Sequence, residues 1–167
     1  MELLEFIIND KPLKSKKYVM KKYKPKYKTQ NNGLLDWDVE KFIKLYNKDV
    51  ELCFLCNGII LQNHSTCLMG LNFHTVLLYK NKKGQIERYD TMNEELKSND
   101  KTRIQYTSNN CSLYAGIVGI IRPLVKDMKT MMKILKLVSD KPNTKSCDKL
   151  SAISKHYFGR DKSYFNY

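Results

Sequence analysis

Residues 73–90 read FHTVLLYKNKKGQIERYD and carry the pattern that decides the fold. The mostly apolar run Phe73–Tyr79 and the strand predicted over Gln85–Tyr89 lie on either side of the polar residues 81–84 (NKKG). Glycine adopts the left-handed backbone conformations that tight turns require. The sequence therefore predicts two antiparallel strands joined by a short turn, and a bulge at Gly84 is one way to adjust their register.

The segments on either side of this hairpin predict mainly helices. Apolar residues recur at helical intervals over residues 36–46 and 123–138. Residues 112–121 are small and apolar, which suits a buried helix, and residues 147–157 predict the last helix. Short apolar runs predict further strands over residues 52–61 and 103–106. Strands grouped in the middle of a chain with helices on both sides indicate an α+β fold, here a central mixed sheet flanked by helices.

Length and charge indicate one domain with a basic extension. The 167 residues suffice for one domain and are too few for two of ordinary size. Lys and Arg number 30 against 17 Asp and Glu, so the formal net charge is +13. Residues 11–28 (KPLKSKKYVMKKYKPKYK) hold nine lysines and no acidic residue. We expect residues 1–32 to form a basic arm and residues 33–167 to form a single catalytic domain.

The composition of the basic arm points to nucleic acid. Excess positive charge attracts polyanions and excludes an acidic solvating chain. Lysine neutralises phosphates, and the interleaved tyrosines can stack on exposed bases. The lysines predicted to bind nucleic acid are Lys14, Lys16, Lys17, Lys21, Lys22, Lys24, Lys26 and Lys28. A solvated tail with no partner is the alternative that this pattern leaves open.

Cysteine usage and the N-terminus bear on the cellular compartment. Five cysteines are an odd number, which disfavours a complete disulfide framework and indicates a reducing compartment. Glu2 and Glu5 flank the first apolar run, where a secretory signal would have basic residues. The apolar stretch Ala115–Ile121 is far shorter than the roughly 20 residues that a membrane span needs. We therefore expect a protein that is not secreted and has no membrane span.

The hairpin places a histidine near a carboxylate. A turn centred between Lys82 and Lys83 pairs residues whose numbers sum to about 165, which brings His74 within one position of facing Asp90. A carboxylate in that position accepts the imidazole N–H and sets the tautomer and orientation of the ring. A register slip of one residue would move one of the two side chains to the other face.

Cys111 has the sequence context of a nucleophile. It follows residues 107–110 (TSNN) and precedes the apolar helix predicted over residues 112–121. The positive end of a helix dipole favours a thiolate, and the unpaired N–H groups of the first turn can bind an oxyanion. Gln105, six residues earlier, adds a side-chain donor. The candidate catalytic residues are therefore His74, Asp90, Cys111 and Gln105.

Taken together, Phe73-His74, Tyr89-Asp90-Thr91, Gln105 and Asn110-Cys111 resemble the cysteine proteases that cleave ubiquitin-like modifiers (the SUMO proteases) and the adenovirus-type maturation proteases (adenain). In that clan His, the acidic residue and Cys occur in this order, and a Gln stands six or seven residues before the Cys. The resemblance spans residues 36–121. It implies an adenain-like cysteine-protease fold and a thiol endopeptidase that cleaves next to small residues, notably Gly.

The chain departs from the family pattern at two positions. Thr75 stands where the family usually has Trp, and Ser112 stands where it usually has Gly. The family Trp helps to form a narrow tunnel for Gly-containing substrates. Its absence, the short length and the basic arm favour a viral maturation protease, which would act on capsid or other virion precursors in the virion or in the host cytoplasm or nucleus. No cofactor is expected, and stimulation by DNA or by an activating peptide stays open.

Three other functions remain as alternatives. The first is a protease that removes ubiquitin or SUMO from conjugates. The second is an acetyltransferase effector, because one bacterial effector family has a similar order of His, acid and Cys. The third is a non-enzymatic basic protein that binds nucleic acid, in which Cys53, Cys56, His64 and Cys67 would hold zinc. Cys53 and Cys56 point to opposite faces of a strand, so core cysteines are favoured and no metal site is predicted.

Overall fold

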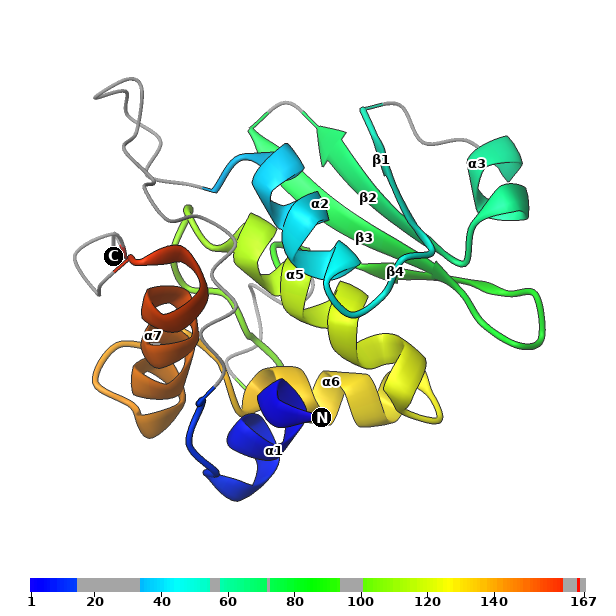
Figure 1. Ribbon diagram of the computed structural model, residues 1–167. Helices are drawn as coiled ribbons and strands as arrows, with labels where there is room; N and C mark the ends of the chain where they lie inside the picture. Colours follow the sequence, from blue (N-terminus) through cyan, green and yellow to red (C-terminus); the bar gives the residue numbers. More distant parts are fainter. Residues whose placement is uncertain (15–33, 55–57, 72, 94–100, 161–164, 166–167) are drawn as a thin grey trace.

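The computed structural model describes residues 1–14, 34–54, 58–71, 73–93, 101–160 and 165 (Figure 1). The strands are β1 (Val50–Cys53), β2 (Thr66–Leu71), β3 (His74–Lys80) and β4 (Ile86–Tyr89). The helices are α1 (Glu2–Asn9), α2 (Asp36–Lys44), α3 (Gly58–Asn63), α5 (Cys111–Ile121), the short 3-10 helix η1 (Arg122–Leu124), α6 (Met128–Lys136) and α7 (Lys145–Phe158).

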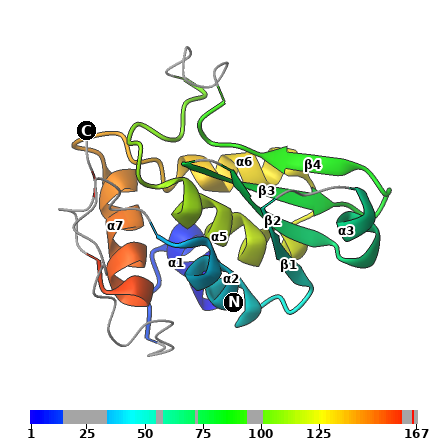
Figure 2. The ribbon, with the colours of Figure 1, turned by 90° about the horizontal axis from the view of Figure 1, so that it is seen from above.

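The strands form one mixed sheet in the order β1-β2-β3-β4. β1 runs parallel to β2, while β2 with β3 and β3 with β4 are antiparallel. Helices α2 and α5 pack against this sheet, and further helices pack against these two (Figures 1 and 2). The α+β class and the mixed sheet predicted from the sequence are therefore confirmed.

The β3–β4 hairpin has a register one residue away from the prediction. Leu77 pairs with Tyr89, so paired residue numbers sum to 166 instead of 165. The N–H of Asn81 donates to the Gln85 carbonyl at 2.9 Å, and Gly84 adopts a φ of 76° in the loop between them. A three-residue loop that ends on a left-handed glycine carries the bulge expected at Gly84.

This register decides where the catalytic candidates lie. A sum of 166 assigns even-numbered residues of both strands to one side of the hairpin, because side chains alternate along a strand. His74 and Asp90 therefore lie on the same side, as diagonal neighbours across the two strands. The predicted register would have placed them on opposite sides.

Helix α5 is the centre of the core. All 11 of its residues are buried, and it packs against β3 and against α2, which itself contacts β1 (Figure 2). The two helices approach closely because α5 has glycines where they meet, and a Cβ added at Gly119 would come within 2.6 Å of Ile43 of α2. On its other side α2 packs Phe42 against Tyr157 of α7, with ring centroids 4.8 Å apart. This packing fixes the N-terminus of α5, where Cys111 is located.

The N-terminal residues belong to the folded core, in contrast to the expected arm over residues 1–32. Leu3 and Ile7 of α1 are fully buried. Lys149 of α7 donates to the Ile7 carbonyl oxygen at 2.8 Å, which ties α1 to α7. The apolar run ELLEFIIN thus supplies an amphipathic helix, and the domain includes residues before the basic segment. Lys14 is exposed, and the other seven predicted nucleic-acid lysines lie outside the described residues.

Three strand predictions differ from the structure. The strand predicted over 52–61 is split, because β1 ends at Cys53 and α3 begins at Gly58. Residues 103–106 form no strand, and the Ile104 carbonyl accepts instead from the Ser139 hydroxyl at 2.8 Å. β2 was not predicted; it is an inner strand with five buried residues in succession, so it lacks the alternation that marks a half-exposed strand.

Two predicted helices have different N-termini. The helix expected over residues 123–138 begins at Met128, because the preceding Asp127 accepts the Thr130 N–H at 2.8 Å as an N-cap. The helix expected over residues 147–157 begins at Lys145. Its cap is Thr144, whose hydroxyl accepts the Cys147 N–H at 3.2 Å.

Candidate active site

The side chains of His74, Asp90 and Cys111 meet at one end of the sheet. His74 is the first residue of β3, Asp90 follows the last residue of β4, and Cys111 is the first residue of α5. His74 Nε2 lies 2.7 Å from Asp90 Oδ1, and the His74 side chain also hydrogen-bonds to the Cys111 thiol. The imidazole therefore joins the thiol to the carboxylate, as the sequence predicted.

The contacts among these groups favour charge separation. The hydrogen bond to Cys111 raises the pKa of His74, and Asp90 raises it further, while burial acts in the opposite direction. Burial raises the pKa of Cys111, but hydrogen bonds from His74, the Thr75 backbone and Ser112 outweigh it and leave the pKa below its ordinary value. A thiolate facing an imidazolium is the state that these two opposite shifts stabilise.

The start of α5 offers backbone donors beside the thiol. Asn110 is the N-cap, and its carbonyl accepts the Tyr114 N–H at 3.0 Å as the first hydrogen bond of the helix. The N–H groups of the first helical turn, beginning with Cys111, have no intrahelical acceptor. A developing negative oxygen next to Cys111 Sγ can accept from them.

Gln105 lies close to the triad but faces inward. Its side chain is fully buried, with Oε1 accepting from the Thr91 hydroxyl at 2.5 Å and Nε2 donating to the Thr107 carbonyl at 2.6 Å. Gln105 therefore links the residue after Asp90 to the loop that leads to Cys111. A hydrogen bond from Gln105 to the oxyanion stays a prediction. It would use the second proton on Nε2, because the first is donated to the Thr107 carbonyl.

Asp140 organises the loop before Cys111 and was not identified from the sequence. Its carboxylate accepts from the Tyr106 N–H at 2.5 Å, the Thr107 hydroxyl at 2.8 Å and the Asn110 amide at 2.8 Å. Burial raises its pKa although these three donors act to lower it. The residue lies about 30 positions after Cys111, so no local pattern connects it to the site.

Replacing Asp140 with alanine is expected to lower the free energy of unfolding by roughly 3 kcal/mol, because buried donors would lose their acceptor. The rate of Cys111 alkylation should fall as well, since the Asn110 cap would no longer be held. Urea denaturation and iodoacetamide kinetics measure the two effects. Asp148→Ala, at an exposed position of α7, is the control. Equal stability of the Asp140 and Asp148 variants would contradict this role.

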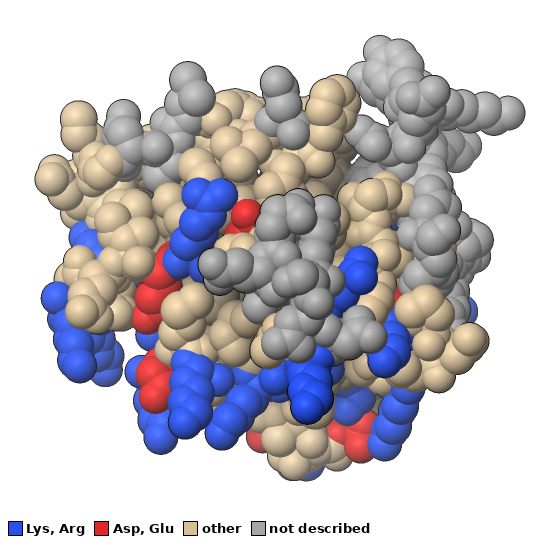
Figure 3. All heavy atoms as spheres, turned by 180° about the vertical axis from the view of Figure 1, so that it is seen from behind, with Lys and Arg blue, Asp and Glu red and all other residues tan. Residues whose placement is uncertain are grey.

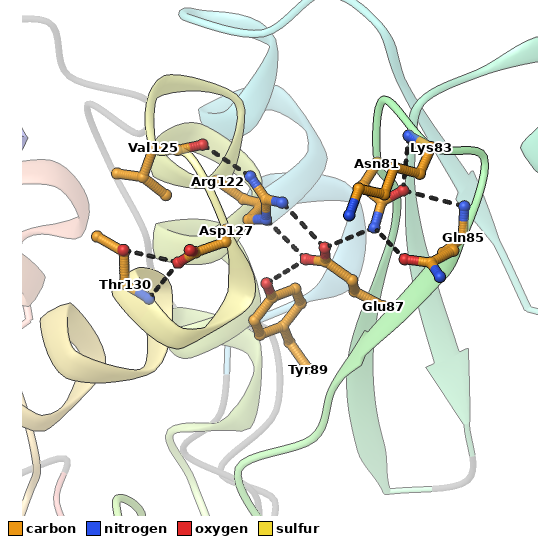
Figure 4. Close-up of polar contacts among 9 residues, drawn as sticks. All are labelled: Asn81, Lys83, Gln85, Glu87, Tyr89, Arg122, Val125, Asp127 and Thr130. Carbon is orange, nitrogen blue, oxygen red and sulfur yellow. Dashed lines mark hydrogen bonds and ion pairs between the residues drawn. The ribbon is translucent and has the colours of Figure 1, made fainter.

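A buried ion pair anchors β4, and Figure 4 shows it. Arg122, directly after α5, contacts Glu87 through two hydrogen bonds of 2.7 and 2.9 Å. The Tyr89 hydroxyl donates to the same carboxylate at 2.5 Å, and the guanidinium lies 4.5 Å from the ring centroid of Tyr79. Both charged side chains are buried. This cluster joins the end of α5 to the strand that leads into Asp90.

A cavity of about 260 Å³ lies beside Asp90, between β4 and α6. Its apolar wall comes from Tyr89, Met128, Met132 and Leu135, and Arg88 stands on the polar side. Arg88 Nη2 is 3.4 Å from Asp90 Oδ2, so the triad carboxylate has a second cationic neighbour.

Exposed apolar side chains occur on the segments that adjoin the triad. Trp37 in the first turn of α2 is 50% exposed, and Phe54 after β1 is 60% exposed. Leu71 ends β2 opposite His74 in the register, and Phe73, with a φ of 57°, is 89% exposed. We call these four residues the apolar rim.

The cysteine and histidine residues considered for zinc have other surroundings. His64 Nδ1 lies 3.2 Å from Asp49 Oδ1, and Nε2 lies 3.6 Å from Glu51 Oε2. Cys67 pairs with Glu51 across β1 and β2, and Cys56 falls outside the described residues. Within the part of the chain that the structure covers, no three His, Cys, Asp or Glu side chains form a cluster suited to a metal ion.

Comparison with known proteins gives no relative: no family model, curated protein or solved structure matches this chain. None of the helices in the described ranges combines the length and the apolar character needed to cross a bilayer.

Proposed function

We propose that this chain is a cysteine endopeptidase that uses a His74, Asp90 and Cys111 triad. One observation carries the proposal: the His74 side chain interacts with the Cys111 thiol and, through Nε2 at 2.7 Å, with the Asp90 carboxylate. Nucleophile, base and orienting acid in this mutual contact support acyl transfer through a thioester. The adenain-like fold and its resemblance to the SUMO proteases are part of this proposal.

The geometry supports a two-step reaction. Cys111 Sγ, as a thiolate, attacks the scissile carbonyl carbon, and the resulting oxyanion accepts hydrogen bonds from N–H groups at the start of α5. The His74 imidazolium gives its proton to the leaving amine, which departs and leaves an acyl group on Cys111. His74 then removes a proton from water, whose attack on the thioester releases the acid and the free thiol. Asp90 orients His74 through both steps.

The apolar rim supports a polypeptide substrate. Side chains such as Trp37 and Phe73 can cover an extended segment whose peptide bond reaches Cys111. Our finer proposal is that the substrates are capsid or other virion precursors cleaved beside small residues. Removal of ubiquitin-like modifiers by the same triad is the second candidate, favoured by the same exposed aromatic side chains, which offer surface for docking a folded modifier.

Activity-based probes separate these candidates. We expect the protein to cleave unfolded polypeptides, with new N-termini mapped by mass spectrometry, and to react only slowly with probes built from ubiquitin and SUMO. Rapid probe adducts on Cys111 would favour the second candidate. Transfer of acetyl from acetyl-coenzyme A to Cys111, without any cleavage, would contradict the peptidase and indicate the acetyltransferase.

We also propose that the basic segment binds nucleic acid through phosphates. Lys and Arg side chains gather on the lower half of the face in Figure 3, and α6 contributes exposed Lys129, Lys133 and Lys136 to the domain surface. Because α1 before the basic segment packs into the core, substitution suits this test better than deletion.

Replacing the seven lysines between residues 16 and 28 with glutamine is expected to weaken DNA affinity and flatten its dependence on salt. Each lost phosphate contact should reduce the slope of log K against log salt by about 0.9. Fluorescence anisotropy with duplex DNA at several salt concentrations measures both effects, and the same replacement of the three α6 lysines measures separately what the domain surface contributes. An unchanged slope in the first variant would contradict the assignment to the basic segment.

A further inference from the structure

The two positions where the chain departs from the protease pattern contact each other beneath the nucleophile. Thr75 Oγ1 and Ser112 Oγ are 2.9 Å apart and buried. Thr75 Oγ1 also lies 2.7 Å from Asp36 Oδ1. At the other end, the Ser112 hydroxyl and the Thr75 backbone N–H both hydrogen-bond to Cys111. A continuous chain of polar atoms therefore runs from Asp36 through two hydroxyls to Cys111 Sγ.

The Asp36 carboxylate fits at this point because Gly70 has no side chain. Asp36 is the first residue of α2, and its Oδ2 faces Gly70 of β2. A Cβ at Gly70 would collide with this oxygen and would lie 2.9 Å from the Phe54 ring. Burial raises the pKa of Asp36, while the Thr75 hydroxyl acts to lower it.

The elements that contact α2 or the Asp36 carboxylate carry several titratable side chains. They include Glu51 and Cys53 of β1, Cys67 of β2, His74 at the start of β3 and Cys111 at the start of α5. Helix α2 itself also carries Asp38, Glu40, Lys41 and Lys44. The pKa of Asp36 is raised by burial, and the Thr75 hydroxyl acts against this shift. The hydroxyl chain is therefore its polar link to the nucleophile.

The number of protons on the two hydroxyls sets the direction of the hydrogen bonds between Asp36 and Cys111. Each hydroxyl has one proton to donate. When Asp36 is ionised, Thr75 donates to Oδ1, and the Thr75 oxygen is then left to accept the proton of Ser112. When Asp36 is protonated it donates to Thr75, which donates to Ser112, and the Ser112 proton is directed to Cys111 Sγ.

We propose that Asp36 is a positioning residue that sets the direction of the Thr75–Ser112 hydroxyl chain and thereby controls whether Ser112 donates a hydrogen bond to the Cys111 thiolate. This inference rests on the proposed function in treating Cys111 as the nucleophile. An ionised Asp36 draws the hydroxyl protons away from sulfur, and a neutral side chain at this position returns them. Thr75 and Ser112, the two residues that differ from the family pattern, therefore belong to one hydrogen-bonded network with Asp36.

Alkylation of Cys111 by iodoacetamide as a function of pH tests this directly, because it reads the thiolate without any substrate. Asp36→Asn is expected to lower the pKa of Cys111 by about half a unit to one unit, since a neutral residue no longer withdraws the Ser112 hydrogen bond. In the Asp36→Asn background, Ser112→Ala should raise it again by about one unit, because the last hydroxyl that donates to Cys111 is then lost. Asp38→Asn, a neutral replacement in the same helical turn, is the matched control and should leave it unchanged.

A double-mutant cycle separates the hydroxyl chain from a direct effect of charge. Thr75→Val removes only the hydroxyl and keeps the backbone N–H that contacts Cys111. In that background the effect of Asp36→Asn should fall by at least half, and Thr75→Ser should restore it. An equal effect of Asp36→Asn in both backgrounds, or no effect in either, would overturn the proposal. If His74→Ala leaves the pKa of Cys111 unchanged, the proposed peptidase is overturned, while the double-mutant cycle still tests the role of Asp36.

Discussion

Replacement of Cys111 with alanine is expected to abolish peptide-bond cleavage, by at least about 10⁴-fold, while the fold persists. Cys111 is the group that forms the thioester, and alanine has no nucleophilic atom to replace its thiol. Alanine suits the first turn of a buried helix, so the loss of stability should be small. Cleavage of an unfolded polypeptide and thermal unfolding of the same sample measure the two effects.

Two other cysteines provide matched controls for this prediction. Cys53 is partly exposed at the end of β1, and Cys147 is fully buried in α7. Alanine at either position should preserve cleavage, with some loss of stability at Cys147 because a cavity forms in the core. Cleavage that persists in Cys111→Ala and disappears in Cys53→Ala would refute the assignment of the nucleophile.

Arg122→Ala is expected to lower the free energy of unfolding by about 3–5 kcal/mol. The substitution leaves the Glu87 carboxylate buried and without its two hydrogen bonds of 2.7 and 2.9 Å. It also removes the guanidinium that lies 4.5 Å from the ring centroid of Tyr79. Urea denaturation of the variant and the wild type gives the difference directly.

A double replacement distinguishes the lost pair from lost packing. Arg122→Met combined with Glu87→Leu removes both charges and should be more stable than Arg122→Ala alone, because no buried charge is left without a partner. The contact with Arg122 lowers the pKa of Glu87 below its ordinary 4.5. The pair therefore contributes stability above pH 4.5 that is lost as the pH falls through the lowered folded pKa. A single variant within 1 kcal/mol of wild type, or one that keeps this acid dependence, would contradict the role of the pair.

Local signals in the sequence located the hairpin and the candidate residues His74, Asp90 and Cys111, but they did not give the register that brings His74 and Asp90 onto one side. The turn residues and the apolar runs on both sides located β3 and β4, and helix periodicity located α5 behind Cys111. The register was displaced by one residue because the turn centre alone does not reveal the bulge at Gly84. The observed register brings His74 and Asp90 onto one side of the hairpin, so the bulge at Gly84 helps to place these two side chains together.

The remaining features depend on contacts that no local pattern records. β2 lacks alternation because it is an inner strand, and α1 becomes a helix of the core by packing Leu3 and Ile7 against distant segments. Asp140 and Asp36 act through hydrogen bonds to residues more than 30 positions away. Both acids stand in segments where a surface position would be the ordinary interpretation, and only the folded chain brings them to Cys111.

We propose that His74 holds Cys111 as a reactive thiolate. The pH dependence of Cys111 alkylation, compared between the wild type and His74→Ala, measures this effect of His74. In the wild type we expect the rate to rise through a pKa well below the free-cysteine value of about 8.5, because His74 hydrogen-bonds to the thiol and lowers its pKa. In His74→Ala the pKa of Cys111 should move to 8.5 or above, because burial still raises it and the hydrogen bond from His74 no longer lowers it. A wild-type midpoint at or above 8.5 that His74→Ala leaves unchanged would contradict the claim.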